Sequence, residues 1–368
     1  MEKVKIGIIG CGVISEIYLE NLTRKFHITE VEAVADLVPE RAKARAESYH
    51  VRKACSVEEL LRDPEIQIVL NLTIPKAHAE VGLAVLQAGK HLYTEKPLSI
   101  SRRDGQKILA LARKKGLLVG GAPDTFLGGS LQTCRKLIDD GEIGEPLAAF
   151  ASMTCPGHER WHPEPDFYYK EGGGPMLDVG PYYITALVHL IGPVAKVSGF
   201  ARKSYPERTI TSQPHYGKKI GVDVPTHVSG SLQFENGAIG TIITSFDIWG
   251  ARLPRIEIYG SKGSLSVPDP NHFSGEIKML KAREDEWRTV PPAYGFTDNN
   301  RGLGLADMAT AVRSGRKHRA NGDMTFHVLD TMQGILESSV SGREYAVESS
   351  CDRPEPFPAG LTEHEVDA

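Results

Sequence analysis

The sequence predicts an α/β protein of two domains, a parallel sheet flanked by helices followed by a domain of mostly antiparallel strands. The chain has 368 residues, more than the roughly 100–200 of one ordinary domain. Up to about residue 120, short apolar strands alternate with helices, which is typical of a parallel sheet with crossover connections. Beyond it, Asn236-Gly237 stands between two strand-like segments and indicates an antiparallel hairpin.

Composition and charge exclude several classes of protein. Hydrophobic residues make up 40% of the chain and charged residues 24%, as in ordinary globular proteins. The formal net charge is −4 and the basic residues form no block, so we expect neither a nucleic-acid nor a membrane partner. The apolar run at residues 4–9 is too short for a signal-peptide core or a membrane span, which predicts a cytoplasmic location. Five cysteines without a CxxC pair indicate reduced thiols.

The first strand leads into the glycine-rich turn Gly10-Cys11-Gly12, and the residues after it have helical spacing. A strand, a turn and a helix in this order are the context that a dinucleotide-binding fingerprint requires. Gly10 permits the tight turn, and Gly12 lets backbone amides approach a pyrophosphate at the helix N-terminus. Ser15 replaces the third glycine, and an ordinary strand–helix turn is the alternative. The candidate cofactor-binding residues here are Gly10, Gly12, Val13 and Ile14.

The second strand, residues 28–35, ends in Asp36. An acidic residue at this place accepts hydrogen bonds from the ribose hydroxyls of a dinucleotide and repels a 2′-phosphate. Leu37 offers no compensating cation, and we interpret Arg41 on the next helix as a solvent-exposed residue. The sequence therefore favours NAD over NADP.

The remaining elements follow from local signals. In the first domain we expect helices over residues 39–49, 76–88 and 101–115, a short helix after the capping box Ser56–Glu59, and strands over 67–72, 91–94 and 117–119. In the second we expect strands over residues 148–153, 194–201, 228–234, 238–246, 255–259 and 275–280, and helices over 302–313 and 324–341. The predicted domains are residues 1–122, which bind NAD, and residues 123–368, which bind substrate. We expect structural roles for His189, Asp307 and His327, and an extended chain over residues 353–368.

Residues 158–162 read His-Glu-Arg-Trp-His, which matches the HExxH pattern of metalloproteases. That pattern binds zinc only on a helix, where two histidines face one metal and the glutamate acts as a base. Pro156-Gly157 precede it and Pro163 and Pro165 follow, which leaves little more than one turn. We therefore expect no metal and interpret the segment as a substrate-pocket loop, with a proline-stiffened surface loop as the alternative.

The fifth strand ends in Glu95-Lys96-Pro97. Together with the Gly10-Cys11-Gly12 turn and the segment Gly-Gly-Gly-Pro-Met-Leu-Asp-Val-Gly-Pro-Tyr at residues 172–182, this resembles the glucose-fructose oxidoreductase / inositol dehydrogenase (Gfo/Idh/MocA) family. The likeness covers nearly the whole chain and includes residues 141–146 and 258–264. It implies a Rossmann domain followed by an α/β domain with a large, open, mostly antiparallel sheet. The exposed face of that sheet commonly makes the subunit contact, so we expect a homodimer or homotetramer.

The resemblance also implies site residues. The motif lysine falls on Lys96, near nicotinamide and substrate together, and the motif aspartate on Asp178. Many members carry a histidine four residues later, where this sequence has Tyr182, as in the subgroup with glucose-fructose oxidoreductase and the dimeric dihydrodiol dehydrogenases. Whether Tyr182 or Lys96 moves the proton stays open. Glu95 and Lys96 also join the cofactor-binding candidates.

The residue chemistry agrees with these roles. Asp178 and Tyr182 stand i and i+4 on a predicted helix with Pro175 in its first turn, and three preceding glycines permit close approach to a ligand. Oxidation of a carbinol needs a group that takes the hydroxyl proton as the hydride leaves. An unperturbed tyrosine or lysine titrates near 10, so nearby positive charge would have to lower its pKa.

Two more segments supply candidates. Thr73, Pro75 and His78 follow the fourth strand at the carboxyl edge of the sheet, where cofactors lie, and family members carry a similar Pro…His pattern near the nicotinamide ribose. A loop with a helix-start histidine is the alternative. The substrate-binding candidates are His158, Trp161 and His162, because aromatic faces and imidazoles suit a sugar ring, together with Lys96, Asp178 and Tyr182.

The leading hypothesis is an enzyme that transfers hydride between NAD(H) and a secondary alcohol or ketone of a sugar, inositol or related polyol. One alternative is a glycoside-cleaving enzyme that retains its NAD, and a net reaction without NADH release would identify it. The other is a non-catalytic NAD-binding regulator, against which Lys96, Pro97 and Asp178 argue, since a sensor needs no proton-transfer groups.

Overall fold

The computed structural model describes residues 2–358, 360, 361, 364 and 366. The chain folds into two units. The first unit comprises residues 1–132, 293–326 and 354–368, and the second unit comprises residues 133–292 and 327–353. Both units are discontinuous in sequence, whereas the predicted boundary at residue 122 is a single cut. Residues 353–358 contain no helix or strand; residues 359, 362, 363, 365, 367 and 368 of the predicted extended segment lie outside the described residues.

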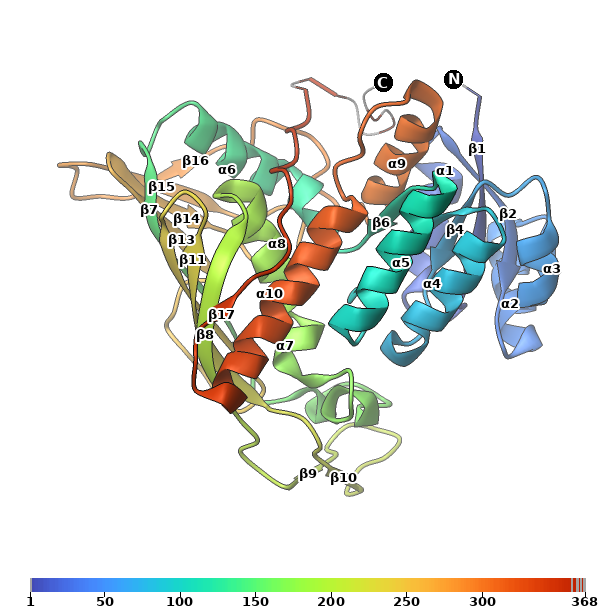
Figure 1. Cartoon of the computed structure of the whole chain (residues 1–368), viewed down its shortest axis with the longest axis horizontal. Coiled ribbons are helices and arrows are strands. Elements are labelled where there is room, and N and C mark those ends of the chain that lie inside the picture. Colours follow the sequence, from blue (N-terminus) through green and yellow to red (C-terminus); the bar gives the residue numbers. More distant parts are fainter. Residues whose placement is uncertain (1, 359, 362–363, 365, 367–368) are drawn as a thin grey trace. The chain divides into compact units, whose positions relative to one another are not determined.

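The first unit is built on a six-stranded parallel sheet in the order β3-β2-β1-β4-β5-β6 (Figure 1). Its strands are β1 (Val4–Ile9), β2 (Thr29–Ala35), β3 (Lys53–Cys55), β4 (Ile68–Asn71), β5 (His91–Thr94) and β6 (Val119–Gly121). All four residues of β4 are buried, as expected where helices cover both faces of a parallel sheet. This confirms the predicted parallel Rossmann sheet.

Helices connect these strands. They are α1 (Ser15–Arg24), α2 (Pro39–Tyr49), α3 (Val57–Arg62), α4 (His78–Gln87) and α5 (Arg102–Lys115), and the segment at residues 293–326 adds α9 (Leu303–Ser314). The predicted capping box is present, since Ser56 accepts from the Glu59 amide and the Glu59 carboxylate accepts from the Ser56 amide. The structure places the sixth strand two residues later than predicted, at Val119–Gly121.

The second unit is built on a nine-stranded sheet in the order β16-β15-β14-β13-β7-β12-β11-β8-β17. Its strands are β7 (Pro146–Thr154), β8 (Val194–Arg202), β11 (His227–Phe234), β12 (Ile239–Ser245), β13 (Ile256–Gly260), β14 (Gly263–Val267), β15 (Ile277–Lys281), β16 (Arg288–Val290) and β17 (Tyr345–Ala346). Among these described strands only β7 and β12 pair in parallel, so the sheet is mostly antiparallel, as predicted. The Asn236-Gly237 hairpin joins β11 and β12, and β9 (Glu207–Thr209) pairs separately with β10 (Lys219–Gly221).

Helices complete the second unit: α6 (Gly129–Asp139), α7 (Gly174–Asp178), α8 (Gly180–Leu190) and α10 (Gly322–Ser341), of which α6 and α10 begin in segments of the first unit. Helix α10 lies against one face of the sheet (Figure 1). There a Cβ at Gly199 or Gly230 would lie within 3.0 Å of Ile335. Cross-strand register puts Phe200, Ser229 and Ile243 in one row on the opposite face, where the Phe200 side chain is 83% exposed.

The three residues expected to be structural lie in the interior and bond within their own units. His189 accepts from Arg135 through its carbonyl. His327 accepts the Val194 amide, and Asp307 pairs with Arg316 and Arg319. Among the described residues no helix combines the length and apolar character needed to cross a bilayer.

The carboxylate of Asp124 binds backbone amides at the start of α9. It accepts the amides of Gly302 and Gly304 at 2.8 and 3.0 Å, and so satisfies donors that the start of a helix leaves unpaired. Asp124 is 1% exposed. Burial raises the pKa of Asp124 to about 6, although both amides oppose the shift.

We expect Asp124→Asn to alter the pH dependence of stability. Because the folded pKa of about 6 lies above the usual 3.8, the folded protein keeps a proton that the unfolded chain loses between these values. The stability that Asp124 contributes is therefore present at low pH and falls as pH rises through this window. Relative to the variant, the wild type should lose about 2–3 kcal/mol of unfolding free energy between pH 4 and pH 7, measured by urea denaturation.

Asp104→Asn is the matched control in the same unit. A hydrogen bond from Lys107 holds the pKa of Asp104 below its usual range, so this carboxylate should contribute more stability as pH rises, the opposite sign. A difference between wild type and Asp124→Asn that does not vary with pH would contradict the burial argument.

Candidate functional site

The glycine-rich turn of the first unit is held by Asp36. The Cys11 amide donates to Asp36 Oδ2 at 2.7 Å and the Val38 amide to Oδ1 at 2.8 Å. Gly10 has a φ of +103°, and a Cβ there would lie 2.6 Å from the Leu72 carbonyl oxygen, so only glycine fits this position. The sequence analysis predicted that the turn and Asp36 bind one dinucleotide; in the structure the two are in direct contact, while the contact of Asp36 with a ribose stays a prediction.

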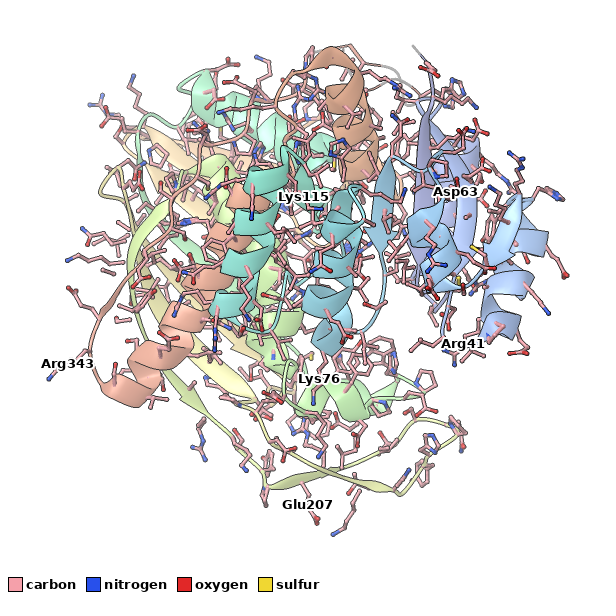
Figure 2. All side chains as sticks on the ribbon, turned by 45° about the vertical axis from the view of Figure 1, so that its right-hand side comes forward. Arg41, Asp63, Lys76, Lys115, Glu207 and Arg343 are labelled. Carbon is pink, nitrogen blue, oxygen red and sulfur yellow. The ribbon has the colours of Figure 1, made fainter. Side chains whose placement is uncertain are left out.

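The surroundings of this turn fit a dinucleotide. Apart from its two chain neighbours, no described residue has a heavy atom within 4 Å of where a Cβ of Gly12 would stand, which leaves space next to the N-terminus of α1. Val13, Leu37 and Ile74 are 82%, 94% and 66% exposed, and they follow the carboxyl ends of β1, β2 and β4. Apolar side chains exposed at that edge of a doubly wound sheet suit the flat base and the ribose of a nucleotide. Arg41 is exposed on α2 (Figure 2), as predicted.

His78 joins two loops at the same edge. Its Nδ1 lies 2.6 Å from the Pro97 carbonyl oxygen and its Nε2 2.9 Å from the Thr73 carbonyl oxygen. Burial lowers the pKa of His78, while both carbonyls act against the shift. Asn71 adds a second tie, since its Oδ1 accepts from Thr73 and its Nδ2 donates to the His78 carbonyl. Both ring nitrogens thus contact backbone, so direct contact of His78 with a cofactor remains a prediction.

Glu95 fixes the start of the Glu95-Lys96-Pro97 segment. Its Oε1 accepts the Tyr18 hydroxyl at 2.8 Å and its Oε2 accepts the Lys96 amide at 2.9 Å. Glu95 is 9% exposed and Tyr18 is fully buried, whereas the Lys96 side chain is partly exposed. The backbone of Lys96 is therefore tied to α1 through Glu95.

In the second unit, the His-Glu-Arg-Trp-His segment forms a single 3₁₀ turn, His158–Arg160. Both carboxylate oxygens of Glu159 are engaged: Oε2 accepts the Tyr169 hydroxyl, and Oε1 lies 3.1 Å from Arg208 Nε. Arg208 also pairs with Asp247 at 3.1 Å. Glu159 is thus part of a buried ion-pair network instead of standing as a free base, and the segment lacks the α-helix on which HExxH depends.

Aromatic rings surround His158. Tyr168 and Phe246 lie 4.4 and 4.5 Å from it between ring centroids, and Trp161 lies 5.4 Å away, edge on. His162 lies 5.3 Å from Tyr168, and Trp161 is 61% exposed. The structure therefore brings the three candidates of this loop, His158, Trp161 and His162, into one cluster that also presents an open aromatic face.

Asp178 joins this cluster, because its Oδ2 lies 3.1 Å from His158 Nε2. The prediction that one helix carries both Asp178 and Tyr182 is wrong. Helix α7 ends at Asp178 and α8 begins at Gly180. Pro181 has no N–H to donate back along the chain, so the helix breaks there and the Tyr182 amide bonds to the Val179 carbonyl instead. Tyr182 is 9% exposed.

The three glycines before α7 were expected to let the backbone approach a ligand. In the structure the close neighbours of two of them, Gly173 and Gly174, are other parts of the second unit. A Cβ at Gly173 would lie 2.5 Å from the Phe167 carbonyl oxygen, and one at Gly174 2.9 Å from that of Pro225. Gly173 therefore permits tight packing against the loop at residues 167–168, and Gly174 against residues 224–225.

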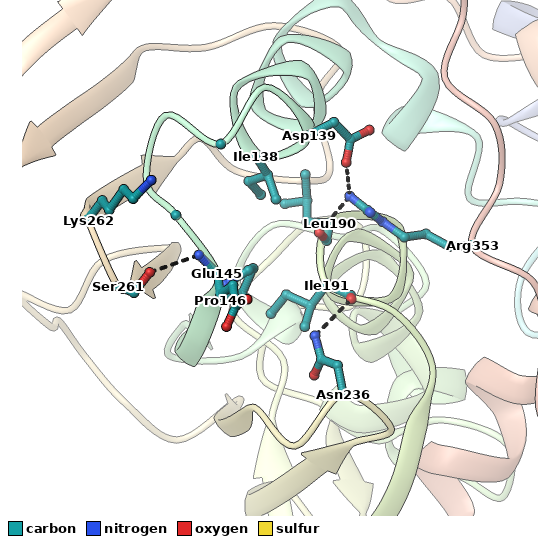
Figure 3. A pocket seen from close by; sticks show the side chains of 12 residues that line it. Ile138, Asp139, Glu145, Pro146, Leu190, Ile191, Asn236, Ser261, Lys262 and Arg353 are labelled. Carbon is teal, nitrogen blue, oxygen red and sulfur yellow. Dashed lines mark hydrogen bonds and ion pairs between the residues drawn. The ribbon is translucent and has the colours of Figure 1, made fainter.

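An open groove of about 480 Å³ lies elsewhere on the second unit (Figure 3). Arg353 pairs with Asp139 at 2.7 Å on one side of it. Asn236 donates to the Ile191 carbonyl, and Ser261 accepts the Glu145 amide. Its polar side chains therefore hold the ends of α6, α8 and a hairpin together, and none of the predicted site residues lines it.

Sequence reasoning did not single out Tyr18, Asn71 or Arg208. Asn71 carried a signal, because it is a polar residue in an otherwise apolar strand. Tyr18 looked like one more apolar position of a helix. Arg208 carried no signal, since Glu159 and Asp247 lie far from it along the chain.

Comparisons with known proteins agree with this geometry. Residues 4–121 match the model of an oxidoreductase family with an NAD-binding Rossmann fold, and residues 131–266 match that of the GFO/IDH/MocA C-terminal domain. Relatives include a myo-inositol 2-dehydrogenase of Thermotoga maritima, 26% identical over 84% of this chain and 88% of that protein. A dTDP-3,4-didehydro-2,6-dideoxy-alpha-D-glucose 3-reductase of Saccharopolyspora spinosa is 29% identical over 85% and 92%.

Solved structures share the fold. A levoglucosan dehydrogenase in complex with NADH and L-sorbose superposes with a TM-score of 0.82 at 21% identity, over 95% of this chain and all of the other. An aldose-aldose oxidoreductase of Caulobacter crescentus has a TM-score of 0.79 at 19% identity, and the match covers 94% of this chain and all of the other. With both family models matched in order along a two-unit α/β chain, this protein belongs to the Gfo/Idh/MocA family of oxidoreductases.

Proposed function

We propose that the protein is an NAD(H)-dependent oxidoreductase that interconverts a secondary alcohol and a ketone on a sugar, inositol or related polyol. The observation that carries the proposal is the cluster around Asp178, where a carboxylate stands beside His158 and an exposed Trp161. A sugar ring presents apolar C–H faces and a rim of hydroxyls, which such a cluster can stack against and hydrogen-bond. The names of the relatives, which act on an inositol and on a nucleotide-linked sugar, support the same substrate class.

The first unit holds the dinucleotide in this proposal. When bound, NAD supplies the hydride acceptor and NADH the donor. Amides at the start of α1, next to Gly12, receive the pyrophosphate. The fixed carboxylate of Asp36 accepts the ribose hydroxyls, and its charge disfavours a 2′-phosphate, so NAD is preferred to NADP.

Proton transfer falls to Lys96, Asp178 and Tyr182, in line with the family resemblance. Lys96 has a fixed backbone and is partly exposed as a residue, which suits a group that meets a ligand. Asp178 accepts or orients a substrate hydroxyl. Tyr182 occupies the position where many relatives carry a histidine, and either it or Lys96 moves the proton.

The proposal is tested by NADH formation with NAD and a panel of inositols, aldoses, glycosides and sugar acids at mildly alkaline pH, and by NADH consumption with the corresponding ketones. Turnover with one substrate class is expected. Lys96→Ala should lower kcat by about 10²–10⁴-fold, the usual contribution of a positioned acid or base, with NAD affinity largely retained.

Lys115→Ala serves as the charge-matched control, because Lys115 lies exposed at the end of α5 and donates only to the Gln87 carbonyl (Figure 2). It should leave turnover unchanged. If Lys96→Ala turns over like the wild type, Lys96 has no part in the chemistry. No turnover in either direction across the panel, with NAD shown to bind, would refute the proposed reaction.

Cofactor choice is tested by Asp36→Ala. Removing the carboxylate removes both the ribose acceptor and the repulsion of a 2′-phosphate, so the ratio of NADP to NAD affinity should rise about tenfold or more, which is ~1.4 kcal/mol. Titration of each dinucleotide by intrinsic fluorescence gives this ratio. Glu47→Ala, an exposed residue of α2, controls for the lost charge, and equal ratios in both variants would rule out selection by Asp36.

We also propose that the open face of the nine-stranded sheet joins two copies of the chain. Phe200 and Ile239 are 83% and 59% exposed on this face, where apolar side chains favour association. Phe200→Glu with Ile239→Glu should yield a monomer of about 40.2 kDa by light scattering. Val340→Glu, an equally exposed apolar position on α10, should keep the wild-type mass; a double variant that keeps it too would place the contact elsewhere.

A further inference from the structure

The cluster in the second unit contains a hydrogen-bonded chain of three side chains. Trp161 Nε1 lies 3.1 Å from His158 Nδ1, and His158 Nε2 lies 3.1 Å from Asp178 Oδ2. The imidazole and the carboxylate of this chain are largely withdrawn from solvent, with side chains 11% and 17% exposed. The chain therefore runs from an exposed indole to the motif aspartate through one buried imidazole.

The two contacts specify one tautomer of His158. An indole nitrogen can only donate a hydrogen bond, so His158 Nδ1 has to be the acceptor. In a neutral imidazole the single proton then sits on Nε2, where it points at the Asp178 carboxylate. The ring thus donates to Asp178 and carries no net charge while it does so.

The ring is also fixed in place. Tyr168 and Phe246 pack on it with centroid distances of 4.4 and 4.5 Å. The His158 backbone amide lies 3.2 Å from the Tyr169 hydroxyl, which in turn bonds to Glu159. A half-turn of this imidazole about its Cβ–Cγ bond would put ring carbons where its two nitrogens stand, so it would lose both hydrogen bonds.

The other titratable groups near His158 have partners of their own or favour a neutral form, so none of them replaces His158 as a hydrogen-bond donor to Asp178. Glu159 is paired with Arg208, and Arg208 with Asp247. His162 is the other nearby titratable ring; burial lowers its pKa, and its Nδ1 accepts the Glu164 amide. Cys155 also lies close, and burial raises the pKa of its thiol, which favours the neutral form.

From this geometry we infer that His158 is a positioning residue for Asp178, and that Trp161 sets the tautomer in which it acts. By donating to Oδ2, His158 fixes the plane of the carboxylate and stabilises its ionised form, as hydrogen bonds donated to a carboxylate do. His158 itself keeps its proton throughout, and no bond is made or broken on it. The effect that we expect on turnover rests on the proposed function, whereas the tautomer of His158 does not depend on it.

The tautomer is measured first, without any substrate. In ¹⁵N-resolved NMR of the imidazoles, assigned by the signal lost in His158→Gln, His158 should appear as the neutral Nε2–H form near pH 7.5. Trp161→Phe, which removes the indole donor but keeps a ring, should shift it toward a mixture of tautomers. Asp178→Asn should move the Nε2 signal. A neutral Nδ1–H form, or signals that ignore both substitutions, would overturn the inference.

Turnover gives the second measurement. His158→Ala should lower kcat by about 10–100-fold, as expected when a reacting group loses its orientation, with a smaller change in KM. In this variant the acid limb of the pH profile of kcat should move to higher pH by about one unit. His158→Gln, whose amide can still donate, should recover most of kcat, and so would show that the lost donor and not a misfolded loop causes the defect.

Trp249→Phe is the matched control for Trp161→Phe. Trp249 is 80% exposed and stacks on Arg160 at 4.6 Å without a bond to His158, so neither the NMR signal nor the pH profile should change. Wild-type kcat and pH profile in His158→Ala would overturn the inference even where the enzyme is active. If no substrate is turned over, the proposed function fails, and the NMR measurement still decides whether His158 donates to Asp178.

Discussion

The buried guanidinium of Arg208 is the constraint on which the candidate substrate region depends. Its side chain is only 9% exposed, and a charge taken out of water without partners costs several kcal/mol. Arg208 finds these partners in Glu159, in Asp247 and in the carbonyls of Pro156 and Phe246. Pro156 and Glu159 belong to the segment that contains the 3₁₀ turn, and Phe246 and Asp247 directly follow β12. Pairing this one charge therefore holds that segment against the sheet. The rest of the cluster can then be built on a fixed backbone.

The same requirement acts at the carboxyl edge of the parallel sheet in the first unit. Glu95 is buried and takes the Tyr18 hydroxyl and the Lys96 amide, while His78 is buried between two backbone carbonyls. A strand that ends in the interior leaves backbone polar groups that can bond neither to the sheet nor to water. Side chains must therefore supply their hydrogen-bond partners. The consequence is a rigid backbone on both sides of Lys96, and rigidity of this kind is what a group that must meet a reacting atom needs.

Local signals predicted much of the fold and of the candidate site. The capping box at Ser56, the helix start at Pro39 and the end of the second strand just before Asp36 each depend on residues close in sequence, and each is present. The break before α8 depends on Pro181 and was also local, but helical spacing concealed it. Arg208 could not be predicted, because its partners are brought to it only by the folded sheet. Strands β14 and β16, short and flanked by polar residues, carry too weak a pattern to stand out.

The break between α7 and α8 affects which side chains can reach Asp178. The family resemblance implies that many members carry a histidine four residues after this aspartate, on the same stretch of chain. Here that position holds Tyr182, on a helix that starts anew after Asp178, and an imidazole reaches Asp178 from a separate loop, through His158. Chemistry depends on which groups meet and in which protonation state, not on their order along the chain. A neutral imidazole held as a donor to a carboxylate does a different task from an imidazole that exchanges protons with substrate. In the proposed reaction the acid–base step then belongs to Lys96 or Tyr182, and the proposed role of the loop is to keep Asp178 in place.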